Sequence, residues 1–204
     1  MKSKHIIIAF ISVGICTSFV YMFNDGDSVK AYNSEVSKER KDKDEFMQNA
    51  NESPFQSNKE TFTGLKYFPP DLKYRIQADL DYVSKREVVT ILSNDGNAQS
   101  YLSYARAEFD LDNLHNTLLI LQIMDGEEKG NLFLAFTDQT SANETYGGGR
   151  YLDVKKIPGA NSITLDFNKA YNPYCAYSEN FSCPFPPKEN NLKVALKAGE
   201  KSYH

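Results

Sequence analysis

The sequence predicts a mainly β protein, an antiparallel β-sandwich or a small barrel, preceded by an N-terminal membrane helix and a short charged helix. Apolar and polar residues alternate with a period of two in most runs between residues 74 and 197, and turn-forming residues separate these runs. An uncharged run near the N-terminus precedes them. We therefore expect a membrane anchor or signal segment in 1–23, a tether and charged helix in 24–52, and a β-rich domain in 53–204.

The membrane helix is predicted from residues 6–23, IIIAFISVGICTSFVYMF, which carry no charge. At ~1.5 Å per residue, a helix of this length just spans the hydrocarbon core of a bilayer. Lys2 and Lys4 precede the run, and Asp25 and Asp27 follow it. The cationic end should therefore stay in the cytoplasm while the remainder of the chain is translocated.

Three interpretations of this segment remain open: an uncleaved signal anchor, a cleaved secretory signal, and a lipidation site at Cys16. All three place the domain outside the cytoplasm. We expect a cell-envelope protein that is membrane-anchored, with a secreted or periplasmic protein after signal cleavage as the alternative. A buried helix of a soluble protein is the remaining interpretation.

The charged helix is predicted from SEVSKERKDKDEFMQNA, which follows a polar tether over residues 24–33. Ser34 can cap its N-terminus, and opposite charges alternate at helical spacing. Its apolar residues are Val36, Phe46 and Met47. This pattern favours a solvated helical stalk whose last turn packs on the domain, and leaves a partner-binding helix as the alternative.

Strands are predicted next, each bounded by turn residues. Asn94-Asp95-Gly96 is typical of a hairpin turn. In ARAEFDL, Ala105 and Phe109 should be buried, whereas Arg106 should face solvent. The predicted strands are YRIQADLDYV (74–83), REVVTIL (86–92), ARAEFDL (105–111), TLLILQIM (117–124), GNLFLAF (130–136), NSITLDF (161–167) and NLKVALK (191–197).

The net charge excludes two classes of partner. The chain carries −4, and removing the first 23 residues leaves 21 bases against 27 acids. Nucleic-acid binding needs a basic face, so we expect no nucleic-acid partner. The same balance argues against docking on an anionic membrane surface.

Two cysteines, Cys175 and Cys183, lie in PYCAYSENFSCPF with seven residues between them. Outside the cytoplasm such a pair is most simply a disulfide, and free thiols or redox chemistry are the alternatives. The spacing does not suit zinc, and the histidines are His5, His115 and His204. We predict no metal site and no cofactor.

The segment ETYGGGRYLD, residues 144–153, combines three glycines with charge. A phosphate-binding glycine loop would have to open a helix, which the following residues do not predict. Either the glycines form a turn or bulge that needs positive φ, or bare backbone lets a ligand or a neighbouring strand approach closely. Glu144 and Arg150 would then lie at the rim, or form an ordinary salt bridge with each other across the turn.

A long loop follows the predicted strand 161–167 and contains both cysteines. Loops of this length inside a compact domain are usually functional or disordered. Six aromatic residues from Phe167 to Phe185 could form a ligand-stacking surface, or they could be the private core of the loop.

The segments ERKDKDEF, GLKYFPPD, ETYGGGRYLD, LDFNKAYNPYCAY and CPFPPKENNLKVALKAGEK, in this order and at these distances, resemble the domain of unknown function 1684 family of bacteria and archaea. The resemblance runs from Glu39 to Lys201. It implies little about mechanism, because the family has no assigned activity. The motif positions it implies are Glu144, Tyr146, Gly147, Gly148, Gly149, Arg150, Asp153, Asp166, Asn168, Tyr171, Asn172, Cys175, Cys183, Pro184, Glu189, Asn190, Gly199 and Glu200.

Two functional hypotheses follow. In the first, the domain is a ligand-binding or structural module of the envelope, and Tyr146, Tyr171 and Arg150 line one concavity for an unknown small ligand or envelope component. Its ligand-binding residues would also include Gly147, Gly148, Gly149, Asp153, Asn168, Asn172, Glu189 and Asn190. In the alternative, the protein is a glycoside-type envelope hydrolase whose paired carboxylates, Glu144 and Asp166, lie within ~10 Å of each other.

Overall fold

The computed structural model describes residues 2–56, 62–155 and 157–204, with side chains from residue 26 onward. The chain divides into two compact units, Met1–Lys41 and Asp42–His204. Its elements are α1 (Lys2–Asn49), η1 (Leu72–Tyr74), β1 (Arg75–Tyr82), β2 (Val88–Leu92), β3 (Ala98–Leu111), β4 (Leu114–Ile123), β5 (Leu132–Phe133), β6 (Ala135–Phe136), β7 (Arg150–Tyr151), β8 (Ser162–Asp166), η2 (Phe167–Lys169) and η3 (Tyr174–Ala176).

Helix α1 is continuous, whereas the sequence predicted a polar tether and a separate helix starting at Ser34. The segment 24–33 contains one glycine and no proline, and its other residues tolerate helical backbone, so nothing forces the helix to stop there. At the C-terminal end of α1, the expectation that the last turn packs on the domain is confirmed. Met47, in the last turn and itself part of the second unit, is buried in a cluster with Phe55 and Tyr177.

The membrane prediction falls on the N-terminal part of α1. Within residues 26–56, 62–155 and 157–204, no helix has both the length and the apolar character needed to cross a bilayer. The expected anchor, residues 6–23, lies outside the part of the chain whose side chains the structure describes.

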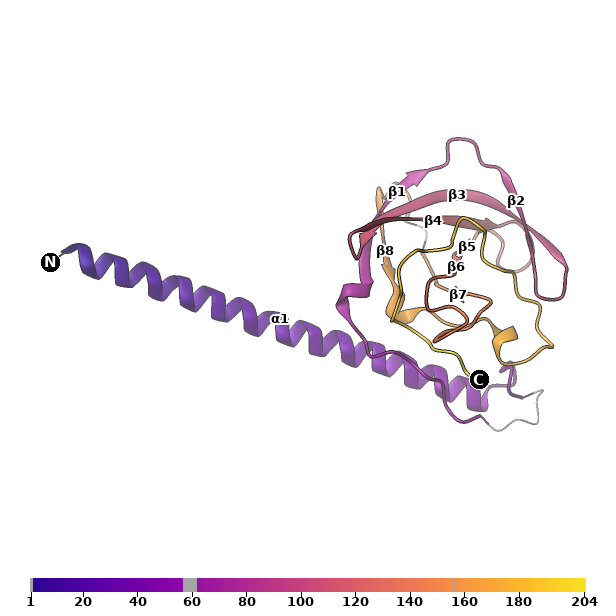
Figure 1. The fold of residues 1–204 in the computed structure, drawn as a ribbon, viewed down its shortest axis with the longest axis horizontal. Coiled ribbons are helices and arrows are strands. Elements are labelled where there is room, and N and C mark those ends of the chain that lie inside the picture. Colours follow the sequence, from indigo (N-terminus) through magenta and orange to yellow (C-terminus); the bar gives the residue numbers. More distant parts are fainter. Residues whose placement is uncertain (1, 57–61, 156) are drawn as a thin grey trace. The chain divides into compact units, whose positions relative to one another are not determined.

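The second unit is built on a strongly curved antiparallel sheet of six strands, ordered β5-β4-β3-β1-β8, with β2 also paired to β3 (Figure 1). The β4 strand pairs along β3 from Tyr101 to Leu111. The β1 and β2 strands share the other edge of β3, β1 on residues 105–108 and β2 on 98–102. A register shift between Ser103 and Ala105 lies between these two stretches, and such bulges bend and twist a sheet.

The predicted antiparallel β class is therefore confirmed, as are two local features. The turn at Asn94-Asp95-Gly96 joins β2 to β3, with Gly96 at φ +83° and Ser93 N donating to the Asn97 carbonyl at 2.8 Å. On β3, Ala105, Ala107, Phe109 and Leu111 are buried on one face, as the period-two alternation predicts.

The main core lies against this face of the sheet. Phe109, Leu118 and Leu165 from the strands pack with Phe136 of β6, which pairs with β7 in a separate two-stranded sheet. A smaller cluster of Ile91, Tyr101, Leu119 and Leu121, supplied by β2, β3 and β4, forms a second core.

The C-terminal run NLKVALK is not a strand, contrary to the prediction. Its alternation is real, because Leu192, Val194 and Leu196 are buried in the main core. Its backbone, however, makes only scattered bonds, such as Leu192 N to the Thr137 carbonyl at 2.8 Å. An extended segment can bury every second residue without pairing in a regular ladder, so periodicity alone could not separate the two cases.

Candidate functional site

The triple glycine lies between Tyr146 and the start of β7. Gly149 has φ +92°, and a Cβ at this position would lie 2.5 Å from Pro186 Cγ and 2.7 Å from the Phe136 carbonyl oxygen. A Cβ on Gly148 would lie 2.5 Å from the ring of Tyr146. The bare backbone thus allows protein segments to approach closely. Gly149 also has positive φ, as the interpretation of the glycines as a turn or bulge required.

Arg150 points into the protein and not to a rim. Its Nη2 donates to Asp138 Oδ2 at 2.8 Å and to the Leu196 carbonyl at 3.0 Å, and Nη1 donates to the Ala198 carbonyl. Burial lowers the pKa of Arg150, and the charge of Asp138 opposes that shift. The salt bridge between Arg150 and Glu144, one of the alternatives that the sequence left open, is not formed, because Arg150 pairs with Asp138 and Glu144 with Lys197.

The carboxylate of Glu200 is the centre of a second buried network. The side chain accepts hydrogen bonds from Tyr177 OH, from Asn172 Nδ2 at 2.8 Å and from Lys43 Nζ at 3.0 Å. Burial, and then the charge of Glu200, raise the pKa of Tyr177 well above its usual value. Asn172, predicted to bind a ligand, is thus held by the protein itself.

The side-chain amides of Asn168 and Asn190, like that of Asn172, form hydrogen bonds within the protein. Asn190 accepts from Leu119 N at 2.7 Å and donates to the carbonyls of Leu119 and Ala135 at 2.9 and 2.8 Å, which links β4 to β6. Asn168 accepts from Asp71 N at 2.9 Å and donates to the Asp71 carbonyl at 2.8 Å. Both amides satisfy backbone groups that have no strand partner there.

The two predicted catalytic acids have different partners. Glu144 Oε1 lies 2.9 Å from Lys197 Nζ. Asp166 caps η2 by accepting from Asn168 N at 3.2 Å, and its other oxygen lies 3.9 Å from Arg75 Nε. Glu189, predicted to bind a ligand, lies 3.5 Å from Arg106 in an exposed pair.

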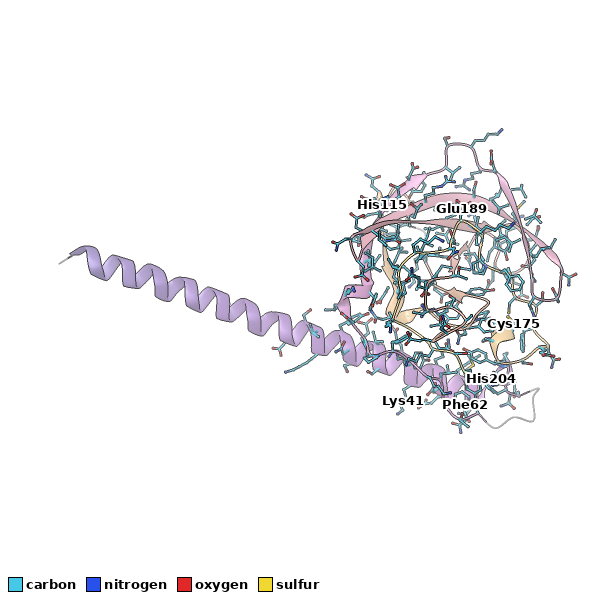
Figure 2. The ribbon with its side chains drawn as sticks, viewed as in Figure 1. Lys41, Phe62, His115, Cys175, Glu189 and His204 are labelled. Atoms are coloured by element: carbon cyan, nitrogen blue, oxygen red, sulfur yellow. The ribbon has the colours of Figure 1, made fainter. Side chains whose placement is uncertain are left out.

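Cys175 and Cys183 are free, so the predicted disulfide is absent from the structure. The residues are nevertheless adjacent, because Cys175 N donates to Cys183 Sγ at 3.2 Å. Tyr146 OH lies 3.8 Å from Cys175 Sγ, which connects the glycine turn to the cysteine loop. Figure 2 shows Cys175 in a different part of the domain from Glu189.

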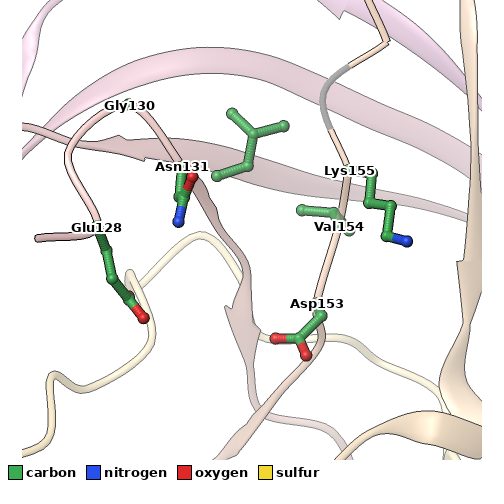
Figure 3. Close-up of a pocket in the computed structure, with 7 residues that line it drawn as sticks. Glu128, Gly130, Asn131, Asp153, Val154 and Lys155 are labelled. Carbon is green, nitrogen blue, oxygen red and sulfur yellow. The ribbon is translucent and has the colours of Figure 1, made fainter.

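One open pocket contains a predicted site residue. It has a volume of about 450 Å³ and lies between the β4–β5 turn and the chain that follows β7. Figure 3 shows Glu128 extending from one wall and Asp153 from the other. The lining residues are Glu128, Gly130, Asn131, Leu132, Asp153, Val154 and Lys155.

A hydrogen bond fixes the Asp153 wall. Tyr171 OH donates to Asp153 Oδ1 at 2.8 Å, and the Tyr151 and Tyr171 backbones exchange two hydrogen bonds, at 2.8 and 3.0 Å. Burial raises the pKa of Tyr171, and the negative charges of Asp153 and Glu128 act in the same direction. Asp153 is the predicted site residue that lines this pocket, whereas Glu128 was missed because it lies in a turn with neighbouring acids.

A metal site of the kind that carboxylate clusters form is not evident. Among the described residues, no three His, Cys, Asp or Glu side chains are arranged to hold a metal ion. The pocket itself is lined by two carboxylates on opposite walls and by Lys155 beside them.

Comparisons with known proteins agree with the motif analysis. The model of the family "Protein of unknown function (DUF1684)" matches residues 60–201. A solution NMR structure of the uncharacterized protein from gene locus rrnAC0354 of Haloarcula marismortui is 33% identical, covers 87% of this chain and 99% of its own, and gives a TM-score of 0.63. No curated protein matches. The matched region covers more than half of the chain and includes the glycine turn, both cysteines and the buried amides, so this chain belongs to the DUF1684 family of proteins of unknown function.

Proposed function

We propose that the domain is a non-catalytic binding module of the cell envelope that takes a small polar ligand carrying a cationic group, such as an amine. The observation that carries this proposal is the pair of carboxylates, Glu128 and Asp153, on opposite walls of an opening of about 450 Å³. This volume lies within the range of small-molecule sites. Glu128 and Asp153 are both exposed, and two carboxylates that face one opening favour a cationic group between them because opposite charges attract.

Further support comes from the rigidity of one wall. Asp153 is held by Tyr171 OH, and Tyr171 is itself held by Tyr151 and by Lys43 Nζ, which lies 4.6 Å from the ring centroid. A carboxylate already fixed by its neighbours loses little conformational freedom when a ligand binds, which favours affinity. Lys155 offers a place for an anionic or hydroxyl group on the same ligand.

The envelope part of the proposal is supported by the N-terminal pattern alone: Lys2 and Lys4, the uncharged residues 6–23, and the acids that follow. The test is a reporter fusion at His204. An enzyme reporter active only outside the cytoplasm should be active in this fusion, and it should lose activity when Ile8 and Val13 are both replaced by Asp.

The hydrolase alternative stays a prediction, and no specific observation favours it. Glu144 and Asp166 are engaged by Lys197 and Arg75, respectively. The pocket is therefore the site at which binding should be tested.

The binding test uses two probes of similar shape and different charge, glucosamine and N-acetylglucosamine, added to the isotope-labelled full chain. Glucosamine should shift the amide resonances of Gly130, Asn131 and Val154, and N-acetylglucosamine should shift them much less. Binding of both probes with equal affinity would contradict the charge-based proposal, and no shift at the pocket with either probe would contradict the site.

Two variants and one control localise the effect. Glu128→Gln and Asp153→Asn remove one charge each and keep hydrogen-bonding capacity, so each should weaken glucosamine binding about threefold to fivefold, the upper part of the range for ion pairs between exposed groups. Glu127→Gln removes a neighbouring exposed charge that does not line the pocket, and it should leave the affinity within about twofold.

A further inference from the structure

The sulfur of Cys183 accepts a backbone hydrogen bond from Cys175. Cys175 N donates to Cys183 Sγ at 3.2 Å. A backbone N–H that donates to a sulfur stabilises its thiolate form. The pair is therefore asymmetric, with Cys183 favoured as the thiolate and Cys175 retaining the proton.

The backbone around Cys183 is fixed by Asn94, in the turn between β2 and β3. Cys183 N donates to Asn94 Oδ1 at 2.7 Å, Asn94 N donates to the Cys183 carbonyl at 3.1 Å, and Asn94 Nδ2 donates to the Phe181 carbonyl at 3.1 Å. Because Cys183 is held on one side by this turn and on the other by Cys175, the two sulfurs stay together. Such preorganisation favours an intramolecular reaction between them.

The pKa values and the solvent exposure of the two cysteines support the assignment of Cys183 as the thiolate. The neighbouring Cys175 lowers the pKa of Cys183 to about 7, whereas the neighbouring Cys183, together with burial, raises the pKa of Cys175. Cys183 is 8% exposed, and Cys175 is partly buried. A reactive sulfur with so little exposure is reached by a small oxidant more readily than by a bulky one.

We propose that Cys175 and Cys183 form a peroxide-reactive dithiol, in which Cys183 attacks the peroxide and Cys175 resolves the product to a disulfide. The Cys183 thiolate attacks one oxygen of ROOH, an S–O bond forms, the O–O bond breaks, and RO⁻ leaves and takes a proton from solvent. The sulfenic acid on Cys183 is then attacked by Cys175. The S–S bond forms, the S–O bond breaks, and hydroxide leaves as water with the Cys175 proton.

The net reaction oxidises two thiols to one disulfide and reduces ROOH to ROH and water. Return to the dithiol requires a thiol reductant, which exchanges with the disulfide. This assignment does not depend on the pocket at Glu128 and Asp153, because it uses different residues.

The experiment uses the full chain carrying Cys16→Ser, so that Cys175 and Cys183 are its two thiols, reduced and then treated with hydrogen peroxide. The mass should fall by two hydrogen atoms, and peptide mapping should locate a disulfide between the two cysteines. With Cys175→Ser added, a 1,3-diketone should trap a sulfenic acid on Cys183. With Cys183→Ser added instead, oxidation should slow at least about tenfold, since an ordinary thiol is a few per cent thiolate at neutral pH.

A measurement without cysteine substitution in the pair guards against misfolded variants. In the Cys16→Ser chain, alkylation mapped by peptide mass should reach Cys183 first, with a rate that rises through a midpoint near pH 7. Equal rates at the two cysteines, a Cys183→Ser variant that reacts like its parent, or oxidation to sulfinic acid without a disulfide would each overturn the proposal.

Discussion

Arg150 Nη2 lies 2.8 Å from Asp138 Oδ2, and the two side chains are 1% and 0% exposed. Removing two charges from water costs several kcal/mol, and their attraction offsets this cost only when further hydrogen bonds satisfy the remaining groups. Here the carbonyls of Leu196 and Ala198 accept from the guanidinium, and Asp138 Oδ1 accepts from Leu196 N at 3.2 Å. The pair therefore attaches the C-terminal segment to β7.

Replacing Arg150 with Ala should lower the free energy of unfolding by about 3 to 5 kcal/mol, because Asp138 is left as a buried, unpaired charge. Urea unfolding of both proteins measures the change. The matched control is Arg106→Ala, which removes the exposed pair with Glu189 and should cost less than about 1 kcal/mol. Similar losses in the two variants would show that the buried pair has no special structural role.

Replacing Gly149 with Ala should destabilise the domain by roughly 2 to 5 kcal/mol, since it combines left-handed backbone strain with a clash against Pro186 and Phe136. Gly96 is the matched control, because it has φ +83° and no atom of the described residues lies within 4 Å of the position that its Cβ would take. Its Ala variant should cost about 1 to 2 kcal/mol, the strain alone. The difference between the losses of unfolding free energy in the two variants measures the cost of the clash at Gly149. Equal losses would contradict the close approach.

Replacing Asn190 with Ala should cost about 2 to 4 kcal/mol, because it leaves Leu119 N and two buried carbonyls without their side-chain partner. Loss of protection from hydrogen exchange should concentrate in β4 and β6. Asn143, which is exposed, serves as the control and should change stability by less than about 0.5 kcal/mol when replaced with Ala. Unchanged exchange at Leu119 would count against the proposed link.

Raising the pH should destabilise the domain above pH 10. Burial raises the pKa of Tyr101 and of Tyr146 to about 12, from a usual value near 10. A folded-state pKa above the unfolded value gives stability that is complete below pH 10 and is lost as the pH rises through 12. Unfolding free energy should therefore fall between pH 10 and 12, with tyrosinate absorbance rising together with unfolding. Full ionisation of all tyrosines in a still folded domain would contradict this expectation.

Much of the β architecture could be predicted because its signals are local. Alternation placed Ala105 and Phe109 of β3 in the core, and Asn94-Asp95-Gly96 located the hairpin, since backbone geometry links these patterns directly to structure. The end of α1 was also predictable, because Met47 is a large apolar residue in a charged helix.

The candidate site was much less predictable. The sequence drew attention to Arg150, Asn168, Asn172 and Asn190, but their side chains hold the protein together instead of lining an opening. Glu128 carried no distinguishing signal, because it is one acid in a turn that also contains Asp125 and Glu127. Its relation to Asp153 arises only when the β4–β5 turn folds beside the chain after β7.

The sequence by itself determined the family, the antiparallel β class, the turn residues and the two cysteines that lie together, because each depends on residue type and short-range spacing. Only the tertiary structure decided that Arg150 pairs with Asp138 and not with Glu144, and that NLKVALK covers a core without joining the sheet. The physical reason is that a buried polar group bonds to whichever partner the fold brings within about 3 Å, and that proximity is set by contacts far apart in the chain.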